Sequence, residues 1–158
     1  MIRLRDGVAA DADKLFELDR VCFEDGVAYS LREFRWLLRS RKTLCIVAED
    51  GDTLAGFVIA QLAVIRKSSG GHIVTIDVAP EFRRRGIGRL LMERTETRLR
   101  AAGADWLRLE VAVKNFAASE FYGGLGFAPI GRIPNYYRDS VDAIVMEKTL
   151  AESGTSVL

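Results

Sequence analysis

The sequence contains few cysteines, histidines and prolines, with two, one and three in 158 residues. Two cysteines are too few for a disulfide scaffold, and a single histidine without a Cys-x-x-Cys pair matches no zinc-site spacing. We therefore expect no metal. Long apolar runs are also missing, because no stretch approaches the roughly 18 residues of a membrane-spanning helix and the N-terminus has no apolar core of the signal-peptide type. These absences predict a cytoplasmic protein without a membrane partner.

The sequence also has no large excess of positive or negative charge. The 23 basic and 22 acidic residues give a formal net charge of +1, so bulk charge predicts no nucleic-acid partner. Almost half of the residues are apolar and 28% are charged, which is an ordinary globular composition. The length suits one domain with a real core. We expect a single domain over residues 1–150 and a disordered tail over 151–158.

Hydrophobic periodicity predicts seven strands and four helices in the order β-α-α-β-β-β-α-β-α-β-β. This order indicates an α/β (α+β) fold, in which a mixed sheet has helices on both faces. The predicted strands are residues 2–6, 43–49, 53–65, 72–78, 105–113, 127–133 and 142–150. The predicted helices are about 12–23, one that begins after residue 30, 86–102 and about 115–125. Residues 68–71 are expected to break the strand pattern, and 134–141 to form a loop.

Two helix starts carry capping signals. Asp11 is expected to cap the first helix, and Ser30 with Glu33 forms a capping-box pattern before the second.

The run "RRRGIG" at 83–88 stands between a predicted strand and a predicted helix. Backbone N–H groups at a helix start have no partner inside the helix, and the helix dipole adds partial positive charge there. Glycines let an anion approach the backbone, and arginines donate charge-assisted hydrogen bonds to phosphate oxygens. The run therefore indicates a phosphate-binding turn. A solvated basic helix start is the alternative interpretation.

Two nucleotide-binding motifs compete for this turn. The P-loop string Gly-x-x-x-x-Gly-Lys-Ser/Thr is absent from the sequence. The dinucleotide fingerprint is matched by Gly86 and Gly88, and Glu110 falls near the expected distance, but Leu91 stands at the third small position. The turn also comes in the middle of the chain, which leaves too little sequence for a substrate domain. A dinucleotide-binding module is thus an incomplete match.

The segment "IDVAPEFRRRGIGRLLM" resembles the acetyl-coenzyme A signature of the GNAT superfamily of N-acetyltransferases, Gln/Arg-x-x-Gly-x-Gly/Ala. The later segment "LEVAVKNFAASEFYGGLGF" is similar to the second half of that family, and the element order resembles the family's mostly antiparallel sheet over residues 2–150. "GHIVTIDV" and the "NYY" before "DAIVMEK" resemble the branch that acetylates protein N-termini, including a ribosomal-protein alanine.

The resemblance implies how acetyl-coenzyme A would bind as cosubstrate. Its pyrophosphate would lie on the backbone amides of residues 84–89, and arginine side chains would serve the outer phosphates. The pantetheine arm would run along the strand at 76–78, where Val78 offers its N–H to the thioester carbonyl. The implied cofactor-binding residues are Ile76, Val78, Arg83, Arg84, Arg85, Gly86, Gly88, Arg89, Asn115 and Tyr122. Asn115 is expected either to bind the pantetheine arm or to cap its helix, or both.

Acetyl transfer to an amine needs a base for the ammonium group, a polarised carbonyl and a proton for the leaving thiolate. Glu110 interrupts the apolar run "WLRLEVAV" and is the candidate base, as the matching glutamate is in the ribosomal-alanine branch. The resemblance places His72 at the acceptor site and gives Tyr122 the role of general acid. The alternatives are a solvent-side glutamate, a surface histidine and a core tyrosine.

Tyr29, Tyr136 and Tyr137 fall in segments that this branch uses to hold the first residues of a peptide, although simple packing is the alternative. "CFEDGVAYS" is similar to the branch's substrate loop, but Glu24 and Asp25 stand where a proline is common. The implied acceptor is a peptide or protein N-terminus. A small amine, a lysine or an antibiotic is the alternative on the same fold, and a non-catalytic acetyl-coenzyme A sensor is the alternative outside it.

Overall fold

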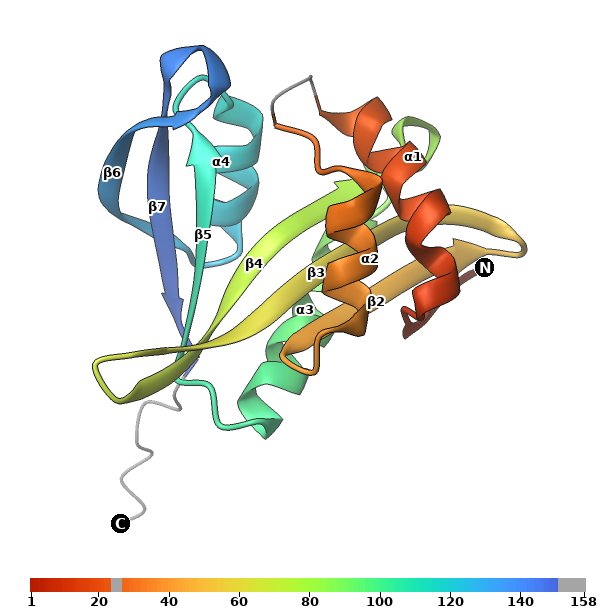
Figure 1. Ribbon diagram of the computed structural model, residues 1–158, viewed down its shortest axis with the longest axis horizontal. Coiled ribbons are helices and arrows are strands. Elements are labelled where there is room, and N and C mark those ends of the chain that lie inside the picture. Colours follow the sequence, from red (N-terminus) through yellow and green to blue (C-terminus); the bar gives the residue numbers. More distant parts are fainter. Residues whose placement is uncertain (24–26, 151–158) are drawn as a thin grey trace.

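A seven-stranded mixed sheet forms the centre of the protein in a computed structural model that describes residues 1–23 and 27–150 (Figure 1). The strand order is β1-β2-β3-β4-β5-β7-β6, and within these ranges only the β4–β5 pair is parallel. The expected tail over 151–158 lies outside the described residues.

The order of elements along the chain confirms the predicted order, and short 3₁₀ helices join some of them. The strands are β1 (Ile2–Asp6), β2 (Thr43–Asp50), β3 (Thr53–Ile65), β4 (Ser68–Val78), β5 (Trp106–Ala112), β6 (Ala128–Tyr137) and β7 (Val141–Thr149). The helices are α1 (Ala12–Cys22), α2 (Leu31–Arg39), α3 (Ile87–Ala101) and α4 (Phe116–Gly124), with 3₁₀ helices η1 (Ala9–Asp11), η2 (Pro80–Phe82) and η3 (Arg138–Ser140).

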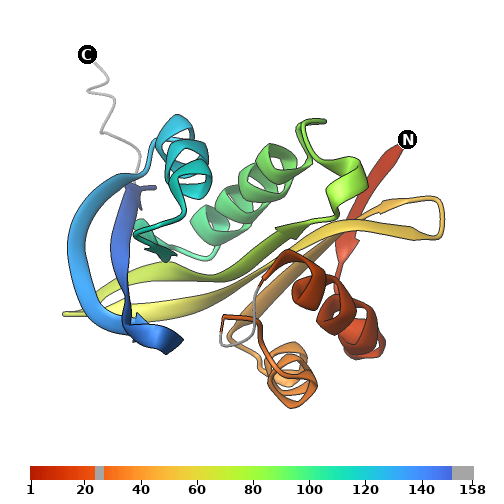
Figure 2. The same cartoon turned by 90° about the horizontal axis from the view of Figure 1, so that it is seen from above.

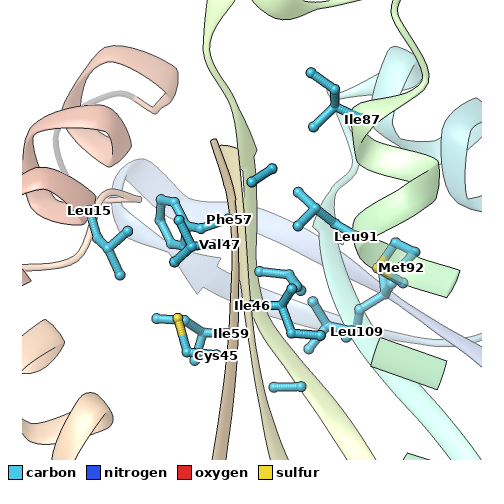
Figure 3. Packing of buried hydrophobic residues seen from close by; sticks show 14 of the residues in the cluster. Leu15, Cys45, Ile46, Val47, Phe57, Ile59, Ile87, Leu91, Met92 and Leu109 are labelled. Carbon is cyan, nitrogen blue, oxygen red and sulfur yellow. The ribbon is translucent and has the colours of Figure 1, made fainter. Parts of the chain in front are cut away.

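Helices α1 and α2 cover one face of the sheet and α3 and α4 cover the other, which confirms the predicted layers (Figure 2). The β2 strand lies between these layers. Figure 3 shows Val47 on the side of Leu15 from α1, and Ile46 on the side of Leu91 from α3. Residues 45–48 are all buried, which is the continuous apolar pattern of a strand covered on both faces. The two faces of β2 thus anchor both helical layers.

The two capping predictions had different outcomes. The Ser30 hydroxyl accepts from the Glu33 N–H, and the Glu33 carboxylate accepts from the Ser30 N–H, so the capping box before α2 is confirmed. The Asp11 prediction was wrong, because no side chain caps α1. The Asp11 carboxylate accepts instead from the Arg5 guanidinium and from a backbone N–H three residues earlier. The Arg5 hydrogen bonds hold the pKa of Asp11 below its usual value.

The β4 strand begins earlier than predicted, at Ser68. Arg66 and Lys67, the two residues before it, have positive φ values of 48° and 66° and form a tight hairpin turn after β3. Gly70 and Gly71 lie inside the strand because neighbouring side chains need the space above them. A Cβ on Gly70 would come within 2.1 Å of the Trp106 ring. The predicted break at 68–71 was therefore wrong, since these glycines serve packing rather than a turn.

The β6 strand also extends further than predicted. It continues through Asn135 to Tyr137, with an irregular register against β7 in this stretch. Asn135 has a φ of 54°, and its N–H donates to the Asp142 carboxylate at 2.9 Å. A side chain of β7 therefore stabilises the irregular backbone where the ladder is interrupted. The predicted loop over 134–141 was wrong at 134–137, and Tyr136 and Tyr137 belong to the end of a strand.

None of the helices within residues 1–23 and 27–150 is both long enough and apolar enough to cross a membrane. The same ranges contain no group of three or more His, Cys, Asp or Glu side chains placed to hold a metal ion.

Candidate active site

The β4 and β5 strands separate after a short parallel ladder and leave an opening in the middle of the sheet (Figure 1). Their pairing joins residues 70–72 of β4 to 106–108 of β5. Shortly after the ladder, Val74 is an extra residue in β4 without a counterpart in the β3 register. Such a bulge bends its strand and disrupts the ladder beside it. The later parts of β4 and β5 therefore border a gap with unpaired edges.

The edge of β4 that borders this gap presents backbone groups of Ile76 and Val78. The Ala79 N–H donates to the Ala55 carbonyl of β3 at 2.8 Å. Because backbone N–H groups point to alternate sides along an antiparallel strand, those of residues 76 and 78 point away from β3. They face the gap, where an extended ligand can pair with them as a strand would.

The first turn of α3 lies beside the end of β4 and has the features of an anion site. Its N-cap residue, Gly86, has a left-handed φ of 77°, which favours glycine. No side chain in the described chain caps this helix, and its first turn carries no acidic residue. The Leu90 N–H makes the first bond of the helix, to the Gly86 carbonyl, so the amides before it have no partner inside the helix. Free amides and the helix dipole together favour a bound phosphate.

The arginines around this helix start differ in their contacts. The Arg83 side chain folds back, so that its Nε donates to the Val78 carbonyl at 3.1 Å and its guanidinium lies 3.6 Å from the Cys22 sulfur. These contacts hold the Arg83 side chain against Val78, the last residue of β4. The sequence did not predict this arrangement. Arg83, Arg84, Arg85 and Arg89 are all exposed around the helix start, and the Arg85 guanidinium lies over the Phe82 ring, 5.1 Å from its centroid. Their exposed guanidinium groups can meet the outer phosphates of a ligand.

Helix α4 lies against the same helix start because Gly88 has no side chain. A Cβ on Gly88 would come within 3.1 Å of the Phe121 ring. Asn115 fixes the beginning of α4, since its side-chain oxygen accepts from the Ala118 N–H at 3.1 Å. The predicted capping role of Asn115 is therefore confirmed. Gly88 and Asn115 together set how closely α4 approaches the gap.

Glu110 and His72 meet across the gap. Nε2 of His72 lies 2.5 Å from Oε2 of Glu110. His72 pairs with Arg108 in the last rung of the parallel ladder, so Glu110 is the next residue of β5 on the same face. Both side chains keep contact with solvent, with 32% of His72 and 18% of Glu110 exposed. The two side chains thus form a hydrogen-bonded pair that joins β4 to β5.

Tyr122 of α4 is buried next to the gap. Its ring packs edge-on against Phe121 and Phe127, with centroid distances of 5.2 and 5.8 Å. Burial raises the pKa of the Tyr122 phenol. The phenol therefore keeps its proton at neutral pH. A protonated hydroxyl in apolar surroundings can donate a proton to a stronger base that forms beside it.

The three tyrosines that the sequence singled out surround one cavity. Tyr29 comes from the segment between α1 and α2, and Tyr136 and Tyr137 come from the end of β6. The cavity has a volume of about 640 Å³ and is lined by Phe16, Arg20, Val27, Ala28, Tyr29, Ser30, Glu33, Tyr136, Tyr137 and Arg138. The Tyr136 and Tyr137 rings pack edge-to-face, 4.8 Å apart. Glu24 and Asp25, noted in the same segment, lie outside the described residues.

These tyrosines also lie near the Glu110 carboxylate. Burial raises the pKa of Tyr29 to about 12, and the pKa values of Tyr136 and Tyr137 are raised as well. Burial is the main cause in each case, and the negative charge of Glu110 contributes to all three. The three tyrosine hydroxyls of the cavity wall therefore keep their protons at neutral pH, near the Glu110 carboxylate.

Sequence reasoning missed a buried polar cluster below the cavity. Asp19 of α1 and Asp77 of β4 are buried with 0% and 2% exposure, and the Thr75 hydroxyl donates to Asp77 at 2.8 Å. A signal was available, because Asp19 follows Leu15 by four residues on the apolar face of its helix. Asp77 likewise takes a buried place in the alternation of β4.

An opened sheet edge, a helix start with amides that have no partner inside the helix and the His72–Glu110 pair lie in one part of the fold, an arrangement that suits an enzyme using an acyl-coenzyme A. The chain belongs to the acetyltransferase (GNAT) family, whose model matches residues 12–127. Acetyl-coenzyme A is therefore its acetyl donor, and the resemblance seen in the sequence is confirmed. Membership of this family also sets aside the dinucleotide-binding alternative.

Similar proteins agree with this assignment. An N-alpha-acetyltransferase of Sulfurisphaera tokodaii is 28% identical over 159 residues, covering 94% of this chain and 93% of the relative. An uncharacterised N-acetyltransferase of Methanocaldococcus jannaschii is 30% identical over 147 residues, covering 92% and 90%. The crystal structure of the ribosomal-protein-S18-alanine N-acetyltransferase from Escherichia coli has a TM-score of 0.84 and 25% identity, covering 100% of this chain and 99% of that one.

Proposed function

We propose that this protein acetylates the α-amino group of protein N-termini in the cytoplasm, by direct attack of the amine on acetyl-coenzyme A within a ternary complex. The observation that carries the proposal is the Glu110–His72 pair, which joins the two strands that border the gap, with Tyr29, Tyr136 and Tyr137 near the Glu110 carboxylate. The names of the similar proteins from S. tokodaii and E. coli support the same acceptor class.

The residues around the gap fit acetyl-coenzyme A. The unpartnered amides of the α3 start would hold the pyrophosphate, and exposed arginines would hold the outer phosphates. The N–H groups of Ile76 and Val78 face the gap, where they would pair with the pantetheine arm and polarise the thioester carbonyl. Asn115 lies at the near end of α4 and would bind the same arm. The cosubstrate would thus present its acetyl group towards Glu110.

A charge placed at Gly86 tests this binding mode. Gly86→Asp should weaken coenzyme A binding on the order of 10-fold more than Gly86→Asn, because the carboxylate competes with the pyrophosphate for the same amides. The two variants share the same shape and the same strain at positive φ, so their difference isolates the charge. An aspartate before a helix also favours the helix, so the unliganded fold should remain intact. Isothermal titration calorimetry measures the difference, and equal affinities would contradict the binding mode.

Glu110 is the proposed base. The attacking amine must be neutral, and a carboxylate at the meeting point of the gap and the cavity can accept its proton directly or through water. His72 lies within hydrogen-bond distance of Glu110 and can pass that proton to solvent. Tyr122 is the proposed general acid, since its protonated phenol lies on the α4 side of the same gap. Tyr29, Tyr136 and Tyr137 would hold the first residues of the peptide.

The chemistry of the amine favours an N-terminus over a lysine. The pKa of an α-amine lies near 8 and that of a lysine near 10.4, so removing the lysine proton costs about 3 kcal/mol more at the same pH. Aromatic walls also hold a short peptide end at a low cost in entropy. A modest base in a narrow cavity therefore suits an α-amine. The rate should rise with pH as the fraction of neutral α-amine grows.

A panel of acceptors tests the proposed function. Peptides with a free N-terminus should release coenzyme A thiol at least tenfold faster than the same peptides with a blocked N-terminus and one lysine, following the difference in amine pKa. Small amines, including aminoglycosides, complete the panel. Faster thiol release with blocked lysine peptides or with small amines would replace the proposed acceptor and leave the acetyl donor unchanged.

A further inference from the structure

Two carboxyl groups are fully buried side by side beneath the proposed peptide cavity. Asp19 lies on α1 and Asp77 lies on β4, and neither forms an ion pair within residues 1–23 and 27–150. A buried carboxylate without compensation is costly, so such a pair must be stabilised by hydrogen bonds or by a change of protonation. The mechanism described above uses neither residue.

In each of the two carboxyl groups, one oxygen accepts a hydrogen bond from the described residues and the other does not. Oδ2 of Asp19 accepts from the Tyr29 N–H at 2.7 Å, and Oδ1 of Asp77 accepts from the Thr75 hydroxyl at 2.8 Å. Within residues 1–23 and 27–150, Oδ1 of Asp19 and Oδ2 of Asp77 are buried and have no hydrogen-bond donor. The two carboxyl groups lie within hydrogen-bonding reach of one another. A single proton between them satisfies both remaining oxygens.

Burial of both carboxyl groups and their mutual repulsion favour one proton held by the pair. Burial raises the pKa of Asp77 well above its usual value, and the charge of Asp19 raises it further. Burial also raises the pKa of Asp19, but the hydrogen bond from Asp77 opposes that rise. Among the other groups around the pair, Glu33 disfavours ionisation of Asp19 and Arg83 favours ionisation of Asp77. The thiol of Cys22, whose pKa burial raises to about 11, is neutral.

The pair connects the two halves of the proposed site. Asp19 fixes the backbone of Tyr29, whose hydroxyl donates to the Val74 carbonyl at the β4 bulge, 3.3 Å away. Asp77 directly precedes Val78, whose backbone faces the cosubstrate gap. One hydrogen bond between carboxyl groups therefore ties the wall of the peptide cavity to the strand that borders the acetyl donor.

We infer that Asp19 and Asp77 are positioning residues that share one proton and hold Tyr29 in place for the peptide. This inference rests on the proposed function, because it treats Tyr29 as a wall of the peptide site. When the shared proton is lost, two buried negative charges repel each other and the attachment of Tyr29 to β4 weakens. The KM for the peptide should therefore rise at alkaline pH, while coenzyme A affinity changes little.

The kinetic test uses Asp77→Asn, which keeps a donor towards Asp19 and an acceptor for Thr75 but cannot ionise. At neutral pH its peptide KM should stay within about twofold of wild type, and the alkaline rise in KM should disappear. Asp77→Val removes the link and should raise the peptide KM on the order of 10-fold at neutral pH, with kcat affected less. Ile73→Val, a buried change on the same strand, is the matched control and should leave KM unchanged.

The stability test does not depend on activity. The native state keeps a proton that unfolded Asp77 releases near its ordinary pKa of 3.8. Stability should therefore fall as pH rises from about 4 towards the raised pKa of the pair. Asp77→Asn removes this slope, so its melting temperature at pH 9 should exceed that of wild type, on the order of 5 °C. Differential scanning calorimetry across this pH range measures the slope.

The outcomes separate this inference from the proposed function. Parallel melting-temperature profiles for wild type and Asp77→Asn would overturn the shared proton, whatever the enzyme acetylates. Different stability profiles with identical KM profiles would overturn the positioning role. If Asp77→Asn does not fold, infrared spectroscopy of wild type replaces it as the test. The carbonyl band of a protonated carboxylic acid should be present at neutral pH, and its absence would overturn the inference. Failure of wild type to acetylate any peptide would instead count against the proposed function.

Discussion

Replacing Glu110 with glutamine should lower kcat/KM for a peptide N-terminus by about 10²- to 10⁴-fold, the range that general bases contribute. Glutamine has nearly the same shape and can still contact His72, but it cannot accept the proton of the attacking ammonium group. Because the defect lies in forming the neutral amine, part of the lost rate should return at alkaline pH, where the free α-amine is already neutral. Steady-state kinetics from neutral to alkaline pH, read as thiol release, measures both effects.

The matched control is Glu147→Gln on the neighbouring strand β7. Glu147 is also a partly buried carboxylate paired with a basic side chain, since it accepts from the Arg108 guanidinium at 2.5 Å. It has no place in the proposed proton path, so the rate of this variant should stay within about twofold of wild type. A Glu110→Gln enzyme as fast as Glu147→Gln would show that the base lies elsewhere, and His72 would then be the next residue to test.

Tyr122→Phe should lower the rate of the chemical step by about 10²-fold or more, while coenzyme A affinity changes little. The substitution keeps the ring that packs against Phe121 and Phe127 and removes only the hydroxyl that would protonate the leaving thiolate. Since the pKa of the phenol is raised by burial, wild type should show no loss of this acid between neutral and mildly alkaline pH. Single-turnover kinetics at saturating acetyl donor isolates the step.

Two further measurements serve as controls for the assignment of Tyr122 as the general acid. Calorimetry should give coenzyme A affinities within about threefold for the two proteins, because the ring packing is unchanged, and their melting temperatures should agree closely. An unchanged single-turnover rate in Tyr122→Phe would assign Tyr122 to packing. A large loss of affinity with a normal rate would assign its hydroxyl to cosubstrate binding instead.

The local sequence was enough to predict the order and type of the seven strands and the four α-helices, but not the short 3₁₀ helices between them. Apolar periodicity identifies the sheet, the capping box at Ser30 identifies the start of α2, and the glycine turn at 83–88 marks the start of α3, whose cosubstrate-binding role remains a prediction. These signals are local, because helix caps and strand alternation depend on neighbours a few residues away. The family resemblance added the candidate residues Glu110, His72 and Tyr122, whose roles remain predictions.

Features that depend on distant contacts were not predictable in the same way. Gly70 and Gly71 looked like a break, but they make room for Trp106 and for leucine side chains from other elements. Asn135 lies in an irregular part of β6 because its N–H donates to Asp142 on the next strand. The separation of β4 from β5 at a bulge likewise depends on how three strands pair. Each of these features requires the tertiary structure.

The buried carboxyl pair shows the same limit within the site. Asp19 and Asp77 are 58 residues apart in the sequence, and each lies at a place where a periodic pattern leads the reader to expect an apolar residue. The patterns mark both residues as exceptions, but only the fold brings their carboxyl groups together. The hydrogen bond that we infer between them would link α1 to β4, and it could not be foreseen from either segment alone.

The most direct test of the central claim is to locate the acetyl group on a peptide that offers both kinds of amine. A peptide with a free N-terminus and an internal lysine, incubated with the protein and acetyl-coenzyme A, should gain one acetyl group on its α-amine. Tandem mass spectrometry reads the position from the fragment masses, and a reaction without the protein corrects for spontaneous acetylation. Acetyl groups found on the lysine, with the α-amine left free, would contradict the account.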